Sequence, residues 1–393
     1  MNFIKERNDL DGKIVLLRLD LNVPIKNGEI TDETRINKIL PILRFLIENK
    51  SKIIVLSHVG RPKGKKSEHL SLKPICKNLE KKINKKINLI TEDIFNLTKQ
   101  KLFKDKNYEV VFLENIRFYF EEEKNDINFA KQLASLGDLY INDAFSCSHR
   151  AHASVSKITK FIPSYAGLQL EVEINALKKV TTEIKEPITC IIGGSKISSK
   201  ISVIKNLIPK FNNIIIVGGM ANNILKFKGH NIGRSIQEDN CDLIIKDIFE
   251  YSKKYSCSII IPEDVVVGKT MEGDPIFKEL NDIENDDIIL DIGLKTIEKI
   301  NNIINSSKTI LWNGPAGYFE NPNFAQGSIE IGKKIANKKK SKEIFSVAGG
   351  GDTVALLNNI GIFDSFNFVS TAGGAFLEYL EGKELPGIKA LSS

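Results

Sequence analysis

Short apolar runs alternate with longer segments in which apolar residues recur every three or four positions, from one end of the 393-residue chain to the other. The runs are rich in Ile, Val and Leu without intervening polar residues, which is typical of strands buried on both faces of a parallel sheet. The longer segments have the period of amphipathic helices. The pattern therefore predicts an α/β fold: two doubly wound parallel-sheet (Rossmann-like) domains joined by a hinge helix.

The predicted strands fall into two groups, one in each half of the chain. They span residues 14–20, 52–58, 109–115 and 138–143, and then 188–194, 213–219, 258–262, 287–293, 308–314, 344–350 and 366–374. Between the groups, an amphipathic segment begins after the helix breakers Pro163 and Gly167 and ends at Pro187. We expect this segment, residues 166–187, to be the hinge helix between a domain at 1–165 and a second at 188–370.

The overall composition is that of a folded globular protein, with 42% hydrophobic and 27% charged residues. The N-terminus lacks the apolar run of a secretory signal, and no run of about 18 apolar residues is present, so we expect a cytoplasmic protein without membrane contact. The five cysteines form no CxxC pair, which favours reduced thiols. The net charge of +7 comes from dispersed lysines without interleaved aromatic residues, which disfavours a nucleic-acid partner.

Arginine is distributed differently from lysine. Of 56 basic residues only eight are Arg, and seven of them precede residue 151: Arg7, Arg18, Arg35, Arg44, Arg61, Arg117 and Arg150. Arg provides a planar, bidentate donor for carboxylate and phosphate groups. Several of these arginines follow predicted strands, where ligands bind in open parallel sheets. The first half is therefore predicted to bind a small anionic substrate.

The corresponding strand ends in the second half are rich in glycine. Gly-Gly pairs at 193–194 and 218–219, and GGGDT at 349–353, each follow a predicted strand. Glycine lets the backbone approach phosphate closely, and a following helix N-terminus supplies free N–H groups. Lys196 and Lys200 are predicted to share one face at the start of a helix, where they would oppose the dipole unless an anion is bound. The second half is therefore predicted to bind a nucleotide, although a merely solvated lysine pair remains possible.

Several other functions are disfavoured by missing motifs. The chain has no GxGxxG at a strand-to-helix turn and no GxxxxGK[ST], so neither a nicotinamide-dependent oxidoreductase nor a P-loop enzyme is supported. His149 and His152 lack a third ligand for zinc. An oxidoreductase on a doubly wound fold and a non-catalytic nucleotide or nucleic-acid binder remain the alternatives.

The motifs, taken in chain order, resemble those of phosphoglycerate kinase over essentially the whole length. They are RLDLNVP (18–24), TDETRI (31–36), HVGRP (58–62), LENIRF (113–118), NDAFSCSHRAHAS (142–154), GGSKISSKI (193–201), GGMA (218–221), WNGPAGYFE (312–320), GGGDT (349–353) and STAGGAFLEYLEG (370–382). The resemblance implies reversible phosphoryl transfer between 1,3-bisphosphoglycerate and MgADP, giving 3-phosphoglycerate and MgATP. It also implies a C-terminal tail (371–393) that returns to the N-terminal domain. Because the two ligands are assigned to different domains, we expect the domains to close about the hinge. Nothing in the sequence suggests oligomerisation, so we expect a monomer.

The same resemblance assigns residues to the two substrates. The glycerate and its phosphate are expected to bind Asp20, Asn22, Arg35, His58, Arg61, Arg117 and Arg150. The nucleotide is expected to bind Gly193, Gly194, Lys196, Lys200, Gly218, Gly219, Gly293, Asn313, Pro315, Gly317, Glu320, Gly350, Gly351, Asp352 and Thr353, with Asp352 also holding magnesium. Arg35, Lys196 and two helix N-termini, at Gly351 and Gly374, are expected to contact the transferring phosphoryl group.

The sequence departs from the family pattern at three positions. Ser195 and Ser199 stand where many members have Ala and an acidic residue, and Ala372 stands where many have the first Gly of a Gly-Gly-Gly run. The methyl group of Ala372 is expected to shift the following helix N-terminus slightly relative to phosphate. These changes are expected to alter affinity rather than to abolish activity.

Overall fold

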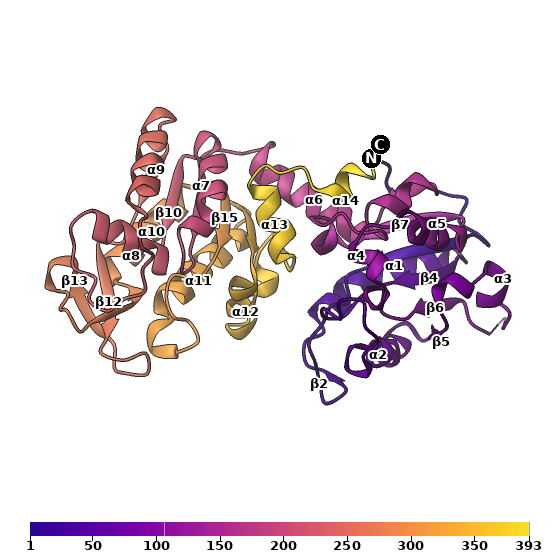
Figure 1. Ribbon diagram of the computed structural model, residues 1–393. Helices are drawn as coiled ribbons and strands as arrows, with labels where there is room; N and C mark the ends of the chain where they lie inside the picture. The colour runs from indigo at the N-terminus through magenta and orange to yellow at the C-terminus, as the bar shows by residue number, and fades with distance from the viewer. Residues whose placement is uncertain (106, 393) are drawn as a thin grey trace. The chain divides into compact units, whose positions relative to one another are not determined.

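The computed structural model describes residues 1–105 and 107–392, which form two compact units (Figure 1). The first unit contains Met1–Ile174 and the residues from Glu384 onward, and the second contains Asn175–Lys383. The boundary lies inside helix α6 (Leu168–Thr181). The second unit thus continues past residue 370, where we expected it to end, as far as Lys383. Only the part of the tail from Glu384 onward belongs to the first unit.

The first unit is built on a six-stranded sheet in the order β5-β6-β4-β1-β7-β8. Every neighbouring pair is parallel, as predicted from the continuous apolar runs. The strands are β1 (Ile14–Leu19), β4 (Lys52–Leu56), β5 (Ile87–Ile90), β6 (Val110–Leu113), β7 (Leu139–Asp143) and β8 (Ser164–Ala166). The short hairpin β2 (Ile25–Lys26) and β3 (Glu29–Ile30) lies outside this sheet.

Helices bury the sheet of the first unit. One core cluster joins α1 (Thr34–Glu48) and α2 (Lys73–Ile83) to alternate residues of the strands, such as Leu17 and Ile53. The strand residues that alternate with these, such as Leu16 and Ile54, point to the opposite face of the sheet and are also fully buried. Both faces of the sheet are therefore covered. The remaining helices of the unit are α3 (Lys99–Leu102), α4 (Phe120–Glu123), α5 (Ile127–Ser135) and α14 (Pro386–Lys389).

The second unit repeats this architecture with a sheet in the order β11-β10-β9-β15-β16-β17, parallel throughout. Its strands are β9 (Ile188–Ile192), β10 (Asn213–Ile216), β11 (Ser258–Ile260), β15 (Thr309–Asn313), β16 (Phe345–Gly349) and β17 (Phe368–Ser370). One core cluster packs α10 (Leu294–Ser306), α11 (Gln326–Lys340) and α12 (Gly351–Asn359) on the sheet. A second layer has α7 (Ile201–Leu207) against α9 (Asp242–Lys254) and α13 (Gly373–Leu380).

One strand prediction was wrong in its pairing. The run at 287–293 forms β14 (Ile288–Ile292), but it pairs antiparallel with β12 (Asp264–Gly268) in a separate sheet of order β13-β12-β14. Neither β12 nor β13 (Ile276–Glu279) was predicted, and β5 and β8 of the first unit were also missed. An apolar run indicates burial on both faces, but it does not identify the neighbouring strand.

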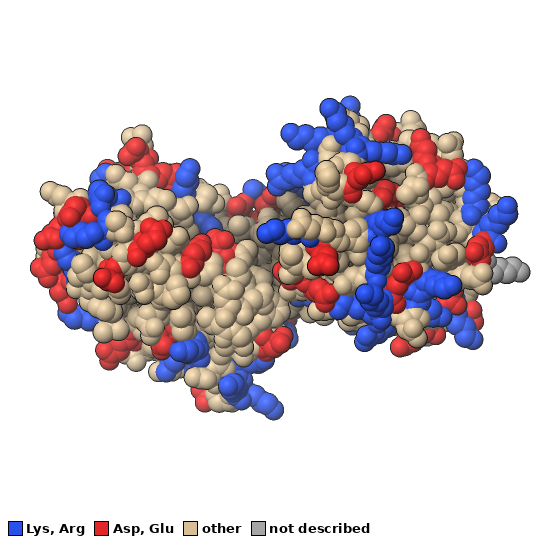
Figure 2. Space-filling model, turned by 90° about the horizontal axis from the view of Figure 1, so that it is seen from below, with Lys and Arg blue, Asp and Glu red and all other residues tan. Residues whose placement is uncertain are grey.

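The visible surface carries charges of both signs, and the cysteines are unpaired. Lys and Arg are interspersed with Asp and Glu on the visible face of both units in Figure 2, so the positive charge does not form one large field there. All five cysteines are free and buried. Within the described residues, no helix combines the length and the hydropathy that crossing a membrane requires.

Candidate functional site

In the first unit, charged side chains gather at the carboxyl ends of β1 and β4. Asp20 follows β1 and pairs with Arg35 of α1, at 3.1 Å between Nη1 and each carboxylate oxygen. Arg35 Nη1 also donates to Asn22 O at 2.9 Å. Asn22 Oδ1 accepts a hydrogen bond from Gly60 N, after β4, at 2.9 Å. These bonds fix one guanidinium group and join the ends of two neighbouring strands.

Arg117 extends this group from the next strand along the sheet. It follows β6, and its Nη1 donates to Gly60 O at 3.3 Å while its Nε lies 3.6 Å from Glu123. Arg61 and Arg150 are exposed, so their guanidinium groups are accessible to an anion from solvent. The predicted substrate residues are therefore brought together on loops that follow β1, β4, β6 and β7, together with α1.

A buried polar layer lies around Arg18 of β1. Arg18 of β1 is fully buried, and it donates to Ser154 Oγ at 3.0 Å and lies 3.1 Å from His58 Nδ1. The buried carboxylate of Glu122 accepts from Ser154 N at 2.9 Å and from Ser154 Oγ at 2.6 Å. Burial, and then the charge of Arg18, hold the pKa of His58 well below its usual value. His58 is thus neutral near pH 7 and contributes a hydrogen-bonding ring rather than a charge.

In the second unit, two loops meet where the strand order changes direction. The order places β9 between β10 and β15, and this is the switch point where open α/β sheets bind ligands. Gly193, after β9, donates its N–H to Asn313 O at 2.8 Å. A Cβ at Gly193 would lie 2.3 Å from Pro315 O, so only glycine permits this approach of the two backbones.

A polar cluster adjoins these loops at the end of β16. The buried side chain of Asn313 donates to Gly349 O at 2.6 Å and accepts a hydrogen bond from Lys200 Nζ. Thr353 Oγ1, also buried, accepts from Gly314 N at 2.7 Å. Gly350 has φ of 101° and precedes α12, whose first turn carries the exposed Asp352. The predicted phosphate residues therefore lie around one helix N-terminus, and Asn313 and Thr353 also hold the loops together.

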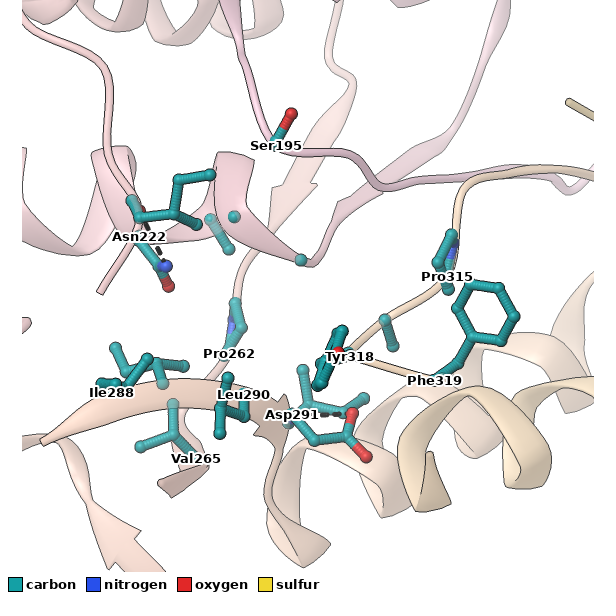
Figure 3. Close-up of a pocket in the computed structure, with 18 of the residues that line it drawn as sticks. Ser195, Asn222, Pro262, Val265, Ile288, Leu290, Asp291, Pro315, Tyr318 and Phe319 are labelled. Carbon is teal, nitrogen blue, oxygen red and sulfur yellow. Dashed lines mark hydrogen bonds between the residues drawn. The ribbon is translucent and has the colours of Figure 1, made fainter. Parts of the chain in front are cut away.

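A cavity of about 480 Å³ opens beside these loops. Figure 3 shows Asn222 and Pro262 on one side and Pro315, Tyr318 and Phe319 on the other. Below them lie apolar side chains from β12 and β14, including Val265, Ile288 and Leu290. An apolar cavity with a glycine-rich polar edge suits the base, ribose and phosphates of a nucleotide.

Apart from Lys196, the predicted nucleotide residues fall into three groups. Those that line the cavity are Gly194, Gly218, Gly219, Pro315, Gly317, Glu320 and Asp352. Those that adjoin it through hydrogen bonds or through α12 are Gly193, Lys200, Asn313, Gly350, Gly351 and Thr353. Gly293 is not among the lining residues; it precedes α10, and a Cβ there would meet the Asp264 carboxylate. Prediction missed the β12 and β14 side chains, because the sheet that presents them was not recognised.

The helical placement of Lys196 and Lys200 was wrong. The α-helix begins only at Ile201, after a 3-10 turn over Ser198–Lys200, so the two lysines do not share an α-helical face. Lys196 lies exposed in the preceding loop, whereas Lys200 is partly buried and its pKa is lowered by that burial. The dipole argument therefore does not apply to Lys196, although its loop runs along the cavity beside Gly194 and Ser195.

Two of the three unusual residues are accommodated without strain. Ala372 precedes α13 with φ of −98°, a backbone conformation open to any residue, and its N–H donates to Ser370 Oγ at 3.2 Å. Gly374 lies in the first turn of α13. Ser199 Oγ donates to Lys196 O at 2.7 Å, and Ser195 lines the cavity. The structure thus gives no steric reason for the expected displacement of the α13 N-terminus.

Asp291, also at the cavity, is a buried carboxyl group that sequence analysis did not select. Its oxygens accept hydrogen bonds from Gly327 N at 2.7 Å and from Ile292 N at 2.8 Å. It therefore satisfies an N–H in the first turn of α11. Burial raises its pKa to about 7.

Comparisons with known proteins cover both units. A family model described as phosphoglycerate kinase matches residues 4–383. The chain is 45% identical to the phosphoglycerate kinase of Wolbachia sp. subsp. Brugia malayi (strain TRS) over 390 residues, which cover 99% of this chain and 98% of that protein. It is 45% identical to that of Dictyoglomus turgidum over 386 residues, covering 98% and 96% respectively. The solved structure of phosphoglycerate kinase from Coxiella burnetii matches with a TM-score of 0.90 at 36% identity, covering 99% of this chain and 98% of that one.

Proposed function

Because the chain belongs to the phosphoglycerate kinase family, we propose that it transfers a phosphoryl group reversibly from 1,3-bisphosphoglycerate to ADP, giving 3-phosphoglycerate and ATP in glycolysis and gluconeogenesis. The observation that carries this proposal is the pairing of two anion sites within one matched chain. One is a cationic group in the first unit, and the other is a glycine-edged cavity in the second. Each suits one of the two substrates.

The first unit binds the glycerate and its phosphate in this proposal. Arg35 is held by Asp20 and Asn22, so its guanidinium group is oriented before the substrate arrives. Arg61 and Arg150 are exposed and supply further bidentate donors. His58, neutral and buried, offers a hydrogen bond without adding charge.

The second unit places the nucleotide with its base among the apolar side chains and its phosphates toward Gly350 and Asp352. Asp352 fits a magnesium site, because its carboxylate is exposed, lines the cavity and follows the glycine turn that opens α12. Bound with the nucleotide phosphates, Mg²⁺ would neutralise part of their charge. Lys200 is tied to Asn313 and supplies a fixed positive charge beside that position.

Transfer itself requires little covalent help from the protein. The acyl phosphate has a good leaving group and the attacking ADP oxygen is already ionised, so no general base is needed. The remaining task is in-line positioning and neutralisation of three equatorial oxygens. Arg35, Lys196 and the N-termini at Gly351 and Gly374 perform it.

The two substrate sites belong to different units, yet transfer needs reacting atoms about 3 to 3.5 Å apart. We therefore propose domain closure about residues 166–187, with 1–165 as the substrate domain, 188–383 as the nucleotide domain, and a tail from Glu384 that returns to the first. Small-angle X-ray scattering tests it. The radius of gyration should fall fully only when 3-phosphoglycerate and nucleotide are both present, and a full fall with one ligand would overturn the hinge proposal.

We further propose that the protein acts as a monomer in the cytoplasm. Five free, buried cysteines suit a reducing compartment. Size-exclusion chromatography with light scattering checks the oligomeric state against the mass of 44.0 kDa.

The activity is tested by coupling ATP formation from 1,3-bisphosphoglycerate and MgADP to a fluorescent or spectrophotometric readout. Purified wild-type protein should form ATP with turnover in the ordinary range for kinases, about 1 to 100 per second. A folded protein that forms no ATP from the acyl phosphate would overturn the proposed function.

A further inference from the structure

The loop that carries Lys196 is fastened at both ends to other parts of the second unit. Near its start, Gly194 O accepts a hydrogen bond from Met220 N of α8 (Gly219–Phe227) at 2.8 Å. Near its end, Ser198 is bound by the carboxylate of Glu238. Ser198 Oγ donates to Glu238 Oε1, and Ser198 N donates to Oε2 at 3.1 Å. Both carboxylate oxygens of Glu238 are thus engaged by one residue of the loop.

Glu238 is itself anchored to the wall of the nucleotide cavity. Its N–H donates to Asn223 Oδ1 of α8 at 2.8 Å, and Asn223 is buried. Two positions earlier, Ile236 O accepts a hydrogen bond from Asn222 Nδ2 at 3.0 Å. Ile236 and Asn222 both line the cavity. The segment 236–238 therefore connects the apolar part of the cavity to the loop of Lys196.

Charge adds to this connection. Hydrogen bonds from Ser198 are the main cause of a lowered pKa at Glu238, and the positive charge of Lys196 lowers that pKa further. Glu238 is therefore ionised near neutral pH, and its negative charge attracts the exposed ammonium group of Lys196. The same carboxylate thus fixes the loop backbone and biases the side chain that the loop carries.

We propose that Glu238 is a positioning residue for phosphoryl transfer, which holds the Lys196 loop through Ser198 and couples it to the base-binding part of the nucleotide cavity. This inference rests on the proposed kinase function and on the role proposed for Lys196. It assigns Glu238 no contact with the reacting atoms. Ser198 Oγ and N are the groups through which it acts.

Three variants separate positioning from a general structural role. Glu238→Gln removes the charge and one acceptor oxygen, Ser198→Ala removes the hydroxyl donor, and Ser198→Thr retains that hydroxyl. The first two should lower kcat by about ten- to a hundredfold, because a displaced catalytic group costs rate rather than ground-state binding. KM for MgADP and for 1,3-bisphosphoglycerate should stay within about twofold. Ser198→Thr should retain most of the kcat.

The decisive measurement is a double-mutant cycle with Lys196→Ala, read as kcat. If Glu238 acts through Lys196, Glu238→Gln should lower kcat in the wild-type background and cause little further loss once Lys196 is replaced. Multiplicative losses would overturn the proposal. So would a Glu238→Gln variant with unchanged kcat, or one whose main defect is a raised KM for MgADP or a lowered unfolding temperature.

Glu250→Gln is the matched control for charge and fold. Glu250 is exposed on α9, and its ion pair is with Lys246 of the same helix, at 3.9 Å in an i,i+4 arrangement. Wild type and Glu250→Gln should form ATP equally well. If neither protein forms ATP, the proposed kinase function itself is wrong. If both form ATP and the kcat of Glu238→Gln equals that of wild type, only the positioning role is wrong.

Discussion

The two units share one architecture but differ in the groups that they present at the carboxyl ends of their strands. The first gathers charged side chains on loops that follow its strands, such as Arg35 held by Asp20, with a buried Arg18 and Glu122 layer beneath. The second uses backbone N–H groups and close approaches that only glycine allows, as at Gly193 and Gly350. Lys196 and Lys200 add charge to a site whose shape the main chain has already set.

This difference decides what a substitution does in each unit. Shortening an exposed arginine removes a contact and leaves the backbone where it was. Adding a methyl group to a glycine at the switch point introduces an atom where another backbone already lies. The first kind of change should affect one ligand selectively, and the second should distort the site that binds the other ligand.

The largest expected effect comes from removing a charged side chain that is proposed to contact the transferring phosphoryl group. Each unit provides one such residue. Lys196→Ala and Arg35→Ala should each lower kcat by on the order of a thousandfold, because they contact charge that develops only during transfer. Ligand affinities, measured by calorimetry, should change little. Near-normal turnover in Lys196→Ala would show that the second unit relies on its backbone alone, and its assignment would be wrong.

The next effect is confined to the first unit. Arg61→Ala and Arg150→Ala should each weaken 3-phosphoglycerate binding by about 1.5 to 3 kcal/mol, the usual range for a charged hydrogen bond. Both side chains are exposed, so folding should be unaffected. Calorimetric titration of each variant with both ligands checks the result, and an equal loss of ADP affinity would contradict the separation of the two sites.

The corresponding change in the second unit is Gly193→Ala. The new Cβ would lie 2.3 Å from Pro315 O, so one of the two loops must move. We expect a loss of nucleotide affinity of about 1 to 3 kcal/mol, the usual cost of forcing an added methyl group into a packed site. Affinity for 3-phosphoglycerate, measured in the same titrations, serves as the internal control. Unchanged ADP binding would mean that the loop approach is not part of the nucleotide site.

The smallest effect concerns a feature that the two units have in common. Burial raises the pKa of Asp143 and of Asp291 to about 7, and each accepts an N–H near the start of a helix, α6 or α11. In the unfolded chain these carboxyl groups ionise near pH 3.9. A raised folded-state pKa means that their contribution to stability is full below about pH 4 and is lost as the pH rises to about 7.

The Asn side chain is neutral at every pH. The unfolding temperature of Asp291→Asn should therefore rise relative to that of wild type from about pH 4 to about pH 7, and the difference should then stay constant. Differential scanning calorimetry at pH 4 to 8 measures the difference. Asp364→Asn, an exposed site in the same unit, should track wild type throughout. A pH-independent difference for Asp291→Asn would show that the carboxyl group is ionised over the whole range.

Much of the fold and of the site could be predicted from local pattern. The runs that became β1, β4, β9 and β15 are continuous apolar segments, and burial on both faces is what a parallel sheet between helix layers requires. The clustering of arginine in the first half is the basis of the anion site proposed there, because the chain otherwise uses lysine. The GGGDT segment likewise predicted the start of a helix, α12. Consecutive glycines at such a position indicate that another group comes close to the backbone.

Other features could not be read from the sequence. The run at β14 has the same apolar character as its neighbours, so nothing local distinguished antiparallel pairing with β12. The placement of Val265 and Leu290 in the wall of the cavity depends on that pairing. The α-helix α7 begins only at Ile201, and Ser198 in the preceding turn is bound by Glu238, 40 positions away.

The sequence by itself thus determined which segments are buried, which halves carry charge or glycine, and which family the motifs resemble. It could do so because burial, helix period and residue chemistry are properties of short stretches of chain. The tertiary structure decided which strand ends meet, which lysine is partly buried beside Asn313, and which carboxyl groups have a pKa raised by burial. These are consequences of contacts between residues far apart in the chain, since desolvation and hydrogen bonding depend on the neighbours that folding supplies.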